Sequence, residues 1–210
     1  MLQGYSSMLY QFCSSVIVDQ DHAATIQYEL DQSHTFEFPE GGIITPISTV
    51  DIKAYYPAED QYFQYYDSNY APSLTLALAQ LESYIQIEGP FDGVLGFSQG
   101  ASLAAAYLVR LSRDFPSRPL PFRCAIFFSG GPPFDPQALE QIEVRIVDAE
   151  ETGPILRLPT ANIWGRNDEV WPGAVKSCAT YARTQTRLCT YTKKDTVSQV
   201  QERRRLFKVV

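Results

Sequence analysis

The sequence predicts an α/β fold with a mostly parallel sheet, because short apolar runs alternate with longer amphipathic runs along the chain. The uninterrupted apolar run at residues 125–128 is typical of a parallel strand covered on both faces. A second short run, at 94–97, is followed at 101–113 by apolar residues at helical spacing. We expect a single domain over residues 1–210, with helices on both faces of the sheet.

The remaining elements have local signals of their own. The expected order is a helix over 22–30, a strand over 35–38, a long loop over 43–72, a helix from Ser73 to about Ile87, a short helix after Asp135, a strand over 161–164, a helix over 172–183 and a strand over 188–191. Ser73 is a candidate N-cap, and Asp135-Pro136 is a typical N-cap and first-turn pair.

Composition excludes several classes of partner. The formal net charge of -7 argues against nucleic acid or an anionic membrane. No apolar run approaches the ~20 residues of a membrane span, and the start of the chain lacks the pattern of a signal peptide. The four cysteines show no metal-binding spacing, so we expect reduced thiols, no metal and no cofactor in a cytoplasmic protein. They are Cys13, Cys124, Cys178 and Cys189.

Residues 96–100, Gly-Phe-Ser-Gln-Gly, match the G-x-S-x-G pattern of a nucleophile elbow. The pattern lies between a predicted strand and a predicted helix, which is the context that such an elbow requires. Gly96 and Gly100 would let the strand and helix approach closely. Ser98 is therefore the candidate nucleophile, and the Gln99 backbone N–H is the candidate oxyanion donor. The alternative is a glycine-rich turn with an ordinary serine.

A catalytic triad of the α/β-hydrolase type follows the chain order Ser, acid, His. Asp168, just after the strand at 161–164, is the expected acid, with Glu169 as its neighbouring competitor. It could instead serve only as a turn residue or helix cap. No histidine follows Asp168: the two in the chain are His22 and His34, for which we expect no catalytic role.

Tyrosine and phenylalanine are abundant, with 13 and 12 residues, and many lie between residues 55 and 66. Core or loop packing explains such a cluster, and so does the rim of a pocket for an apolar substrate.

Residues 89–101 resemble the elbow signature of the fungal small serine hydrolases, which are relatives of the ovarian-cancer-gene-two protein and have the α/β-hydrolase fold. Segments at 23–30, 34–38, 62–67 and 158–168 agree, so the resemblance spans about residues 22–190. It implies that Ser98 is the nucleophile and Asp168 the acid. It also implies an esterase or thioesterase acting on an acyl ester or polyketide-type acyl thioester in fungal secondary metabolism, with an acyl-carrier domain as a possible partner.

Both ends depart from that family pattern. Residues 2–5 are interpreted as a remnant of the family's first oxyanion turn, with the strand before it absent, and no Gly-His loop follows the strand at 188–191. We therefore expect atypical ends over 1–21 and 192–210, truncated or altered. The alternative function is a catalytically impaired relative that binds or regulates. A nucleotide-binding module is disfavoured, since neither glycine-rich phosphate motif is present.

Overall fold

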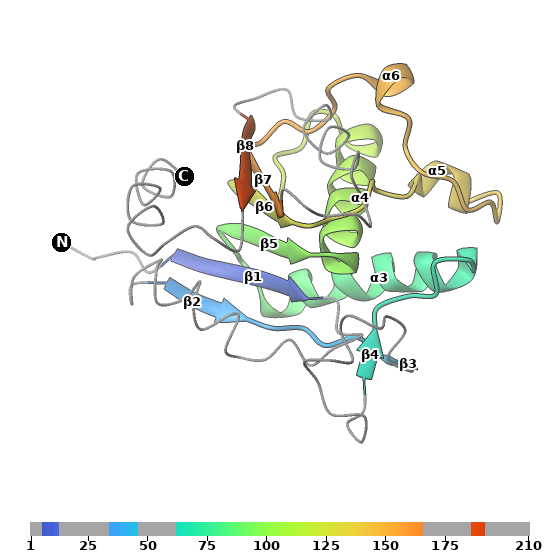
Figure 1. Cartoon of the computed structure of the whole chain (residues 1–210), viewed down its shortest axis with the longest axis horizontal. Coiled ribbons are helices and arrows are strands. Elements are labelled where there is room, and N and C mark those ends of the chain that lie inside the picture. Colours follow the sequence, from blue (N-terminus) through green and yellow to red (C-terminus); the bar gives the residue numbers. More distant parts are fainter. Residues whose placement is uncertain (1–5, 13–33, 46–61, 166–185, 192–210) are drawn as a thin grey trace.

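The computed structural model describes residues 6–12, 34–45, 62–165 and 186–191. Six strands of this part form one sheet in the order β2-β1-β5-β6-β7-β8, and every neighbouring pair is parallel. Their bounds are β1 Ser6–Phe12, β2 His34–Glu37, β5 Gly93–Phe97, β6 Cys124–Phe128, β7 Thr160–Gly165 and β8 Thr186–Tyr191. Figure 1 shows β2, β1 and β5 side by side and pointing the same way. The predicted α/β class with a mostly parallel sheet is confirmed.

The order of the strands reverses between β1 and β5. From β1 the chain adds β2 on one side, and from β5 it adds β6, β7 and β8 on the other. Phe12 at the end of β1 pairs with Phe97 at the end of β5, so these two carboxyl ends lie next to each other. In open α/β sheets, ligands bind at such a reversal, outside the carboxyl ends of the strands. Ser98 follows Phe97 directly.

Two long helices pack on one face of this sheet. They are α3, Ala71–Glu88, and α4, Gln99–Asp114. The buried residues of α3 recur at helical spacing and share one cluster with Val94 and Phe127 of the strands. They include Leu74, Leu78, Leu81 and Ile85. Leu95, Cys124 and Ile126 form a second cluster, because side chains of one strand alternate between the two faces.

Helix α4 is buried on more than one face. Residues 101–109 are all buried, which is more than the single face that apolar residues at helical spacing over 101–113 predict, and Leu111 is only half-buried. Small side chains explain the difference: Ala104, Ala105 and Ala106 let the helix lie close to the sheet and to neighbouring helices at once. A buried leucine such as Leu108 contributes about 1.5–3 kcal/mol by its removal from water.

The prediction of a loop over residues 43–72 is partly wrong. Strands β3, Ile43–Thr45, and β4, Tyr62–Gln64, lie within it and form a two-stranded antiparallel sheet. Helix α3 also begins earlier than predicted, at Ala71, because Pro72 occupies its first turn and has the backbone angle that a helix start requires. Ser73 is not the N-cap, because it lies within the first turn of α3, whose N-cap is Tyr70. Its hydroxyl instead accepts a 2.9 Å hydrogen bond from the Asp67 N–H.

The chain does contain a first strand at its amino-terminal side, which corrects our interpretation of that end. β1 lies inside the sheet, between β2 and β5, and residues 2–5 precede it. They therefore cannot be the turn that follows such a strand. The sequence of β1, Ser-Ser-Met-Leu-Tyr-Gln-Phe, only partly alternates between polar and apolar residues, so its period of two is weak.

Several other predictions concern residues that the structure does not describe, namely the helices over 22–30 and 172–183. The short helices α5, Pro136–Leu139, and α6, Ala149–Thr152, connect β6 to β7. As predicted, Asp135 caps α5, accepting a hydrogen bond from the Gln137 N–H. Within the described ranges, none of the helices is both long and apolar enough to span a membrane.

Candidate active site

Ser98 lies in a strained turn between β5 and α4. Its backbone angles are φ 50° and ψ -115°, in a region that non-glycine residues rarely adopt. Such a conformation costs on the order of 1–3 kcal/mol and persists only where the surrounding structure imposes it. The Ser98 side chain makes no capping hydrogen bond to α4. The strand–turn–helix context expected of a nucleophile elbow is therefore present, with the serine hydroxyl not used as a cap.

Two glycines make this turn possible. A Cβ on Gly96 would lie 2.5 Å from the Ala101 Cα and 2.9 Å from the Gly100 carbonyl oxygen. A Cβ on Gly130 would lie 2.6 Å from the Ala101 Cβ. Real Cβ atoms do not approach other heavy atoms so closely, so both positions need glycine. The sequence predicted the role of Gly96 and missed that of Gly130, which is distant in the chain.

Backbone hydrogen bonds tie the elbow to the end of β6. The Ser98 N–H donates to the Phe128 carbonyl over 2.9 Å, and the Ser98 carbonyl accepts from the Ser102 N–H over 3.2 Å. The buried Ser102 hydroxyl then donates to the Gly131 carbonyl over 3.1 Å. Ser129, the residue after β6, also has a positive φ, 43°. Two adjacent strand ends therefore carry strained serines, and a backbone hydrogen bond joins these ends.

The Gln99 N–H is the first of α4. The first N–H groups of a helix have no acceptor within it, and they carry the positive end of the helix dipole. None of the hydrogen bonds among the described residues uses this N–H. A donor in that position can stabilise a negative oxygen that develops beside Ser98.

The Gln99 side chain holds the chain segment that follows β4. Its Oε1 accepts a 2.8 Å hydrogen bond from the Tyr65 N–H, and its Nε2 donates to the Tyr66 carbonyl over 2.9 Å. The Tyr66 hydroxyl donates to the Gln99 carbonyl over 3.4 Å. These contacts connect the elbow to residues more than thirty positions earlier in the sequence. No local pattern in the sequence indicated this role of the glutamine.

Three of the described aromatic residues of this segment are buried. Tyr62, Tyr65 and Tyr66 are buried, and the Tyr66 ring packs edge-on against Phe134 with 5.3 Å between ring centroids. The Tyr65 hydroxyl donates to the Pro39 carbonyl over 2.7 Å. Of the two alternatives for the cluster at 55–66, core packing therefore holds for these three tyrosines, while residues 55–61 lie outside the described part.

The structure does not describe the predicted acid. Asp168, Glu169 and His22 all lie outside the described residues. β7 ends at Gly165 and is separated from β5 by β6 alone, so the chain that leads to Asp168 leaves the sheet at the same edge as Ser98.

His34 lies at the opposite end of the sheet from Ser98. It pairs with Ser6 at the start of β1, whereas Phe97 pairs with Phe12 at its end. The two positions are therefore about 20 Å apart along β1 alone. His34 cannot reach Ser98 in this fold, in agreement with the expectation that it has no catalytic role. Its Nδ1 is buried and has no hydrogen-bond partner among the described residues.

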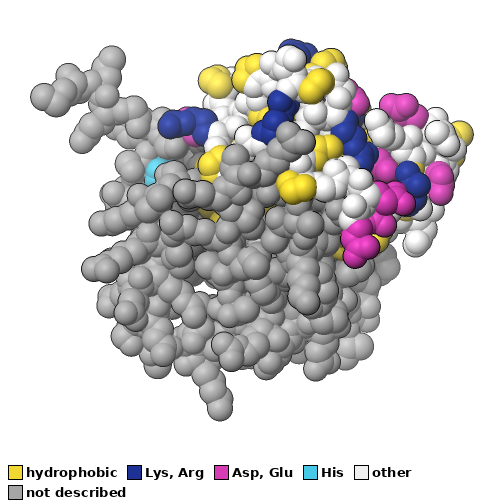
Figure 2. Space-filling view, turned by 90° about the horizontal axis from the view of Figure 1, so that it is seen from above, with side chains coloured by type: hydrophobic (Ala, Val, Ile, Leu, Met, Phe, Trp, Pro, Cys, Tyr) yellow, Lys and Arg dark blue, Asp and Glu magenta, His cyan; other side chains and the backbone are white. Residues whose placement is uncertain are grey.

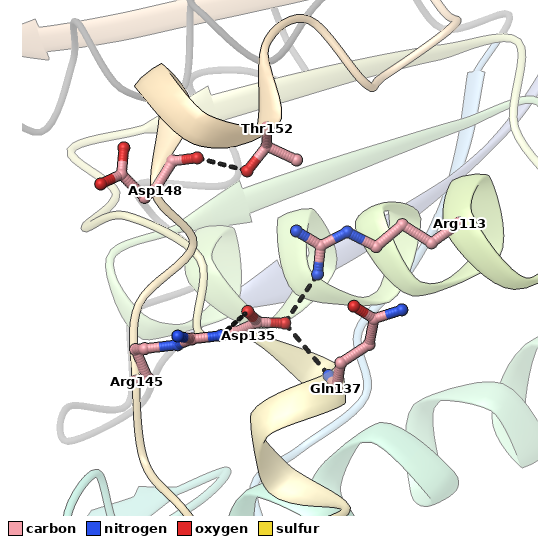
Figure 3. A network of polar contacts seen from close by, with 6 residues as sticks. All are labelled: Arg113, Asp135, Gln137, Arg145, Asp148 and Thr152. Atoms are coloured by element: carbon pink, nitrogen blue, oxygen red, sulfur yellow. Dashed lines mark hydrogen bonds and ion pairs between the residues drawn. The ribbon is translucent and has the colours of Figure 1, made fainter.

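A network of charges surrounds Asp135, near the carboxyl end of α4 (Figure 3). The buried Asp135 carboxylate accepts from Arg113 over 2.6 Å, from Arg145 over 3.0 Å and from the Gln137 N–H over 3.1 Å. Burial raises the pKa of Asp135, but these hydrogen bonds and the charge of Arg113 outweigh it and hold the pKa below its usual value of 3.8. The network joins α4, α5 and the segment before α6, and we assign it to stability.

No group of side chains in the described ranges could hold a metal ion. Cys124 is a buried free thiol, and burial raises its pKa to about 11. It is therefore protonated at neutral pH and is a poor nucleophile.

Known proteins resemble this chain in sequence and in fold. The family described as serine hydrolase (FSH1) matches residues 7–197. Esterase FPY3 of Fusarium mangiferae is 40% identical over 177 residues, which are 84% of this chain and 75% of that protein. Hydrolase phiM of a fungal species is 37% identical over 99 residues, 47% of this chain and 46% of that protein. The chain thus matches less than half the length of this second relative.

Solved structures show the same fold at low identity. A carboxylesterase from Mesorhizobium loti superposes with a TM-score of 0.63 at 16% identity, over 98% of this chain and 89% of that one. The sheet, the elbow between β5 and α4 and the family match over most of the sequence agree with one another. The chain belongs to the FSH1 family of serine hydrolases and has the α/β-hydrolase fold.

Proposed function

We propose that this protein hydrolyses carboxylic esters or thioesters, with Ser98 as nucleophile, the Gln99 N–H as an oxyanion donor and Asp168 as the triad acid. The observation that carries the proposal is the strained Ser98 at the reversal of strand order, beside a helix N-terminus. Family membership supports a serine-based hydrolysis, and a relative named as an esterase supports an ester substrate.

The chemistry proceeds by acyl transfer in two stages. The Ser98 oxygen attacks the acyl carbon, and the carbonyl electron pair moves onto its oxygen, where the Gln99 N–H stabilises the charge. The bond to the leaving alcohol or thiol then breaks, and the leaving group takes up the proton that the serine lost. Water attacks the acyl-enzyme in the same way, releases the acid and restores Ser98.

The chain has no evident residue to act as the base for this proton transfer. A triad histidine would be oriented by Asp168, but no histidine follows His34 in the 210 residues. In subtilisin, a serine hydrolase of another fold, removing the triad histidine lowers kcat by about 10⁶. We therefore propose that this chain turns over slowly, and the missing base also favours the second candidate, a relative that binds acyl groups without turnover.

The proposed substrate carries an apolar acyl group. Phe97 and Phe128 pair at the ends of β5 and β6, directly before the two strained serines, and both are only half-buried. A polyketide-type thioester on an acyl-carrier domain in fungal secondary metabolism is the finer proposal, and it rests on the sequence resemblance.

A substrate panel tests this function. The purified chain is given a nitrophenyl ester, a short acyl thioester, a peptide and a phosphate monoester, with Ser98→Ala as the matched control. We expect slow hydrolysis of the ester or thioester that the control lacks. Hydrolysis confined to the peptide or the phosphate ester would contradict the proposal. Binding of an acyl ligand without turnover would favour the second candidate.

A further inference from the structure

The segment between α5 and α6 exposes three large apolar side chains in alternation. Ile142, Val144 and Ile146 are 75%, 41% and 58% exposed, while Glu143 and Arg145 alternate with them. Figure 1 shows this part of the chain at the outer edge of the molecule, next to α5. Figure 2 shows acidic and basic side chains gathered at the same end. Exposed apolar residues that cluster in this way mark interaction sites.

Ile142 has an additional feature. Its φ is 60°, a conformation that favours glycine or asparagine and is a clear outlier for a β-branched residue. The strain is on the order of 1–3 kcal/mol, and a side chain that is 75% exposed recovers little of it by burial within the chain. An isoleucine at this turn is therefore better explained by a contact outside the chain.

The backbone of the segment is paired on one side only, by a single antiparallel bridge. Ile146 forms an antiparallel bridge with Phe134, in which the Asp135 N–H donates to the Arg145 carbonyl over 2.6 Å and the Val147 N–H donates to the Pro133 carbonyl over 2.8 Å. Because successive residues of a strand point their polar groups to opposite sides, those of Val144 and Ile146 point away from this bridge. No hydrogen bond in the described part of the chain uses them. They form a free edge that can pair with another strand.

We infer that this edge pairs with the same edge of a second copy of the chain, antiparallel and centred on Val144. In that register Val144 faces its own counterpart. Ile146 lies beside Ile142 of the other copy, which adds an apolar contact rather than a ladder hydrogen bond, because the Ile142 N–H is already bonded to the Leu139 carbonyl. Glu143 faces Arg145 of the other copy, and the reverse, so two opposite-charge pairs form. The sequence Ile-Glu-Val-Arg-Ile is thus complementary to itself in apolar character and in charge. This match favours a second copy over an unrelated partner, since a two-fold contact requires a self-complementary surface.

The conformation of this segment is already fixed in the single chain. Arg145 is fixed by its bond to the buried Asp135, which Arg113 also holds. The Arg145 side chain remains 57% exposed, so its five-donor guanidinium keeps N–H groups for a second carboxylate. A surface that is already ordered loses less conformational freedom on binding.

Sedimentation of the 210-residue chain, over a concentration series from low micromolar to near-millimolar, tests the inference. We expect a reversible dimer. Val144→Lys places two like charges opposite each other at the centre and should raise the dimer dissociation constant at least about tenfold. The matched control Ile87→Lys, on α3 and similarly exposed at 76%, should leave it unchanged. A chain that stays monomeric throughout, or a dimer that Val144→Lys does not weaken, overturns the inference.

Crosslinking tests the register independently of affinity. Directly paired residues in an antiparallel ladder have Cα atoms about 5.5 Å apart, within the range that a disulfide spans. Val144→Cys should therefore form a disulfide-linked dimer on mild oxidation, above the background of the unsubstituted chain, and Ile87→Cys should not. Equal crosslinking by both variants contradicts the register. Neither experiment depends on hydrolytic activity, so its result is separate from that of the proposed function.

Discussion

The Gln99 Oε1 accepts a 2.8 Å hydrogen bond from the Tyr65 N–H, which joins the residue after the candidate nucleophile to a segment 34 positions earlier. The same side chain donates to the Tyr66 carbonyl. Its amide thus satisfies one backbone donor and one backbone acceptor of the segment after β4. The residue whose N–H we assign to the oxyanion also fixes the chain segment bonded to the elbow.

We expect Gln99→Met to lower the free energy of unfolding by about 1–3 kcal/mol, because the Tyr65 N–H and the Tyr66 carbonyl both lose their hydrogen bond to the Gln99 side chain. Amide exchange of Tyr65 should accelerate. Urea unfolding and hydrogen exchange followed by mass spectrometry measure the two effects. Gln80→Met, at an exposed position of α3, is the control and should change neither. Unchanged exchange at Tyr65 in Gln99→Met would show that the side chain does not hold this segment.

Gly96→Ala should be strongly destabilising. The new Cβ would meet backbone atoms of Ala101 and Gly100, which cannot move without displacing α4. We expect a loss of at least about 3 kcal/mol, at the upper end of the range for overpacking. Gly42→Ala is the matched control, since a Cβ there meets nothing within 4 Å. Similar unfolding midpoints for the two variants would contradict the close approach of β5 and α4.

Ser98→Gly separates strain from chemistry. Glycine adopts positive φ without steric cost, so the variant should gain about 0.5–2 kcal/mol after its greater unfolded-state entropy is subtracted. It should also lose all reactivity at this position. Thermal unfolding measures the gain, with Ser98→Ala, which keeps the Cβ, as reference. If Ser98→Gly is no more stable than Ser98→Ala, the turn at Ser98 is not strained.

Asp135→Asn should lower stability by about 2–4 kcal/mol at neutral pH, because it leaves the largely buried Arg113 without its countercharge. Asparagine still caps α5 well, so the loss reports mainly the charge.

The effect of Asp135→Asn should also depend on pH. The folded pKa of Asp135 is lowered, so its stabilisation is present above the unfolded value of 3.8 and is lost as pH falls through the folded pKa. The difference between wild type and Asp135→Asn should therefore shrink below about pH 4. Asp148→Asn, at an exposed position, is the comparison. A difference that stays constant down to the acid transition would contradict the ionised network.

The sequence predicted those elements whose signals are local. Strands β5 and β6 are continuous apolar runs, and the Asp135-Pro136 pair marks the start of α5. The sequence was less informative about elements whose conformation depends on tertiary contacts. β1 is stabilised by two neighbouring strands rather than by its own pattern, and β3 and β4 are three-residue strands that form only because they pair.

The same distinction between local and long-range signals applies to the candidate site. Ser98 and Gly96 belong to one motif and could be predicted together. The contribution of Gly130 and the hydrogen bonds from Gln99 to Tyr65 and Tyr66 depend on residues far apart in the sequence, which only the fold brings together.

The central claim, that Ser98 is the nucleophile, is tested most directly by competitive labelling. The folded chain is exposed to increasing amounts of a fluorophosphonate, which modifies activated serines, and each adduct is located by peptide mass spectrometry. We predict that Ser98 is modified at a lower probe concentration than any other residue, and that Ser98→Ala removes this first adduct alone. Labelling is expected to be slow, because the chain has no histidine after His34. Modification of another residue ahead of Ser98 would contradict the account.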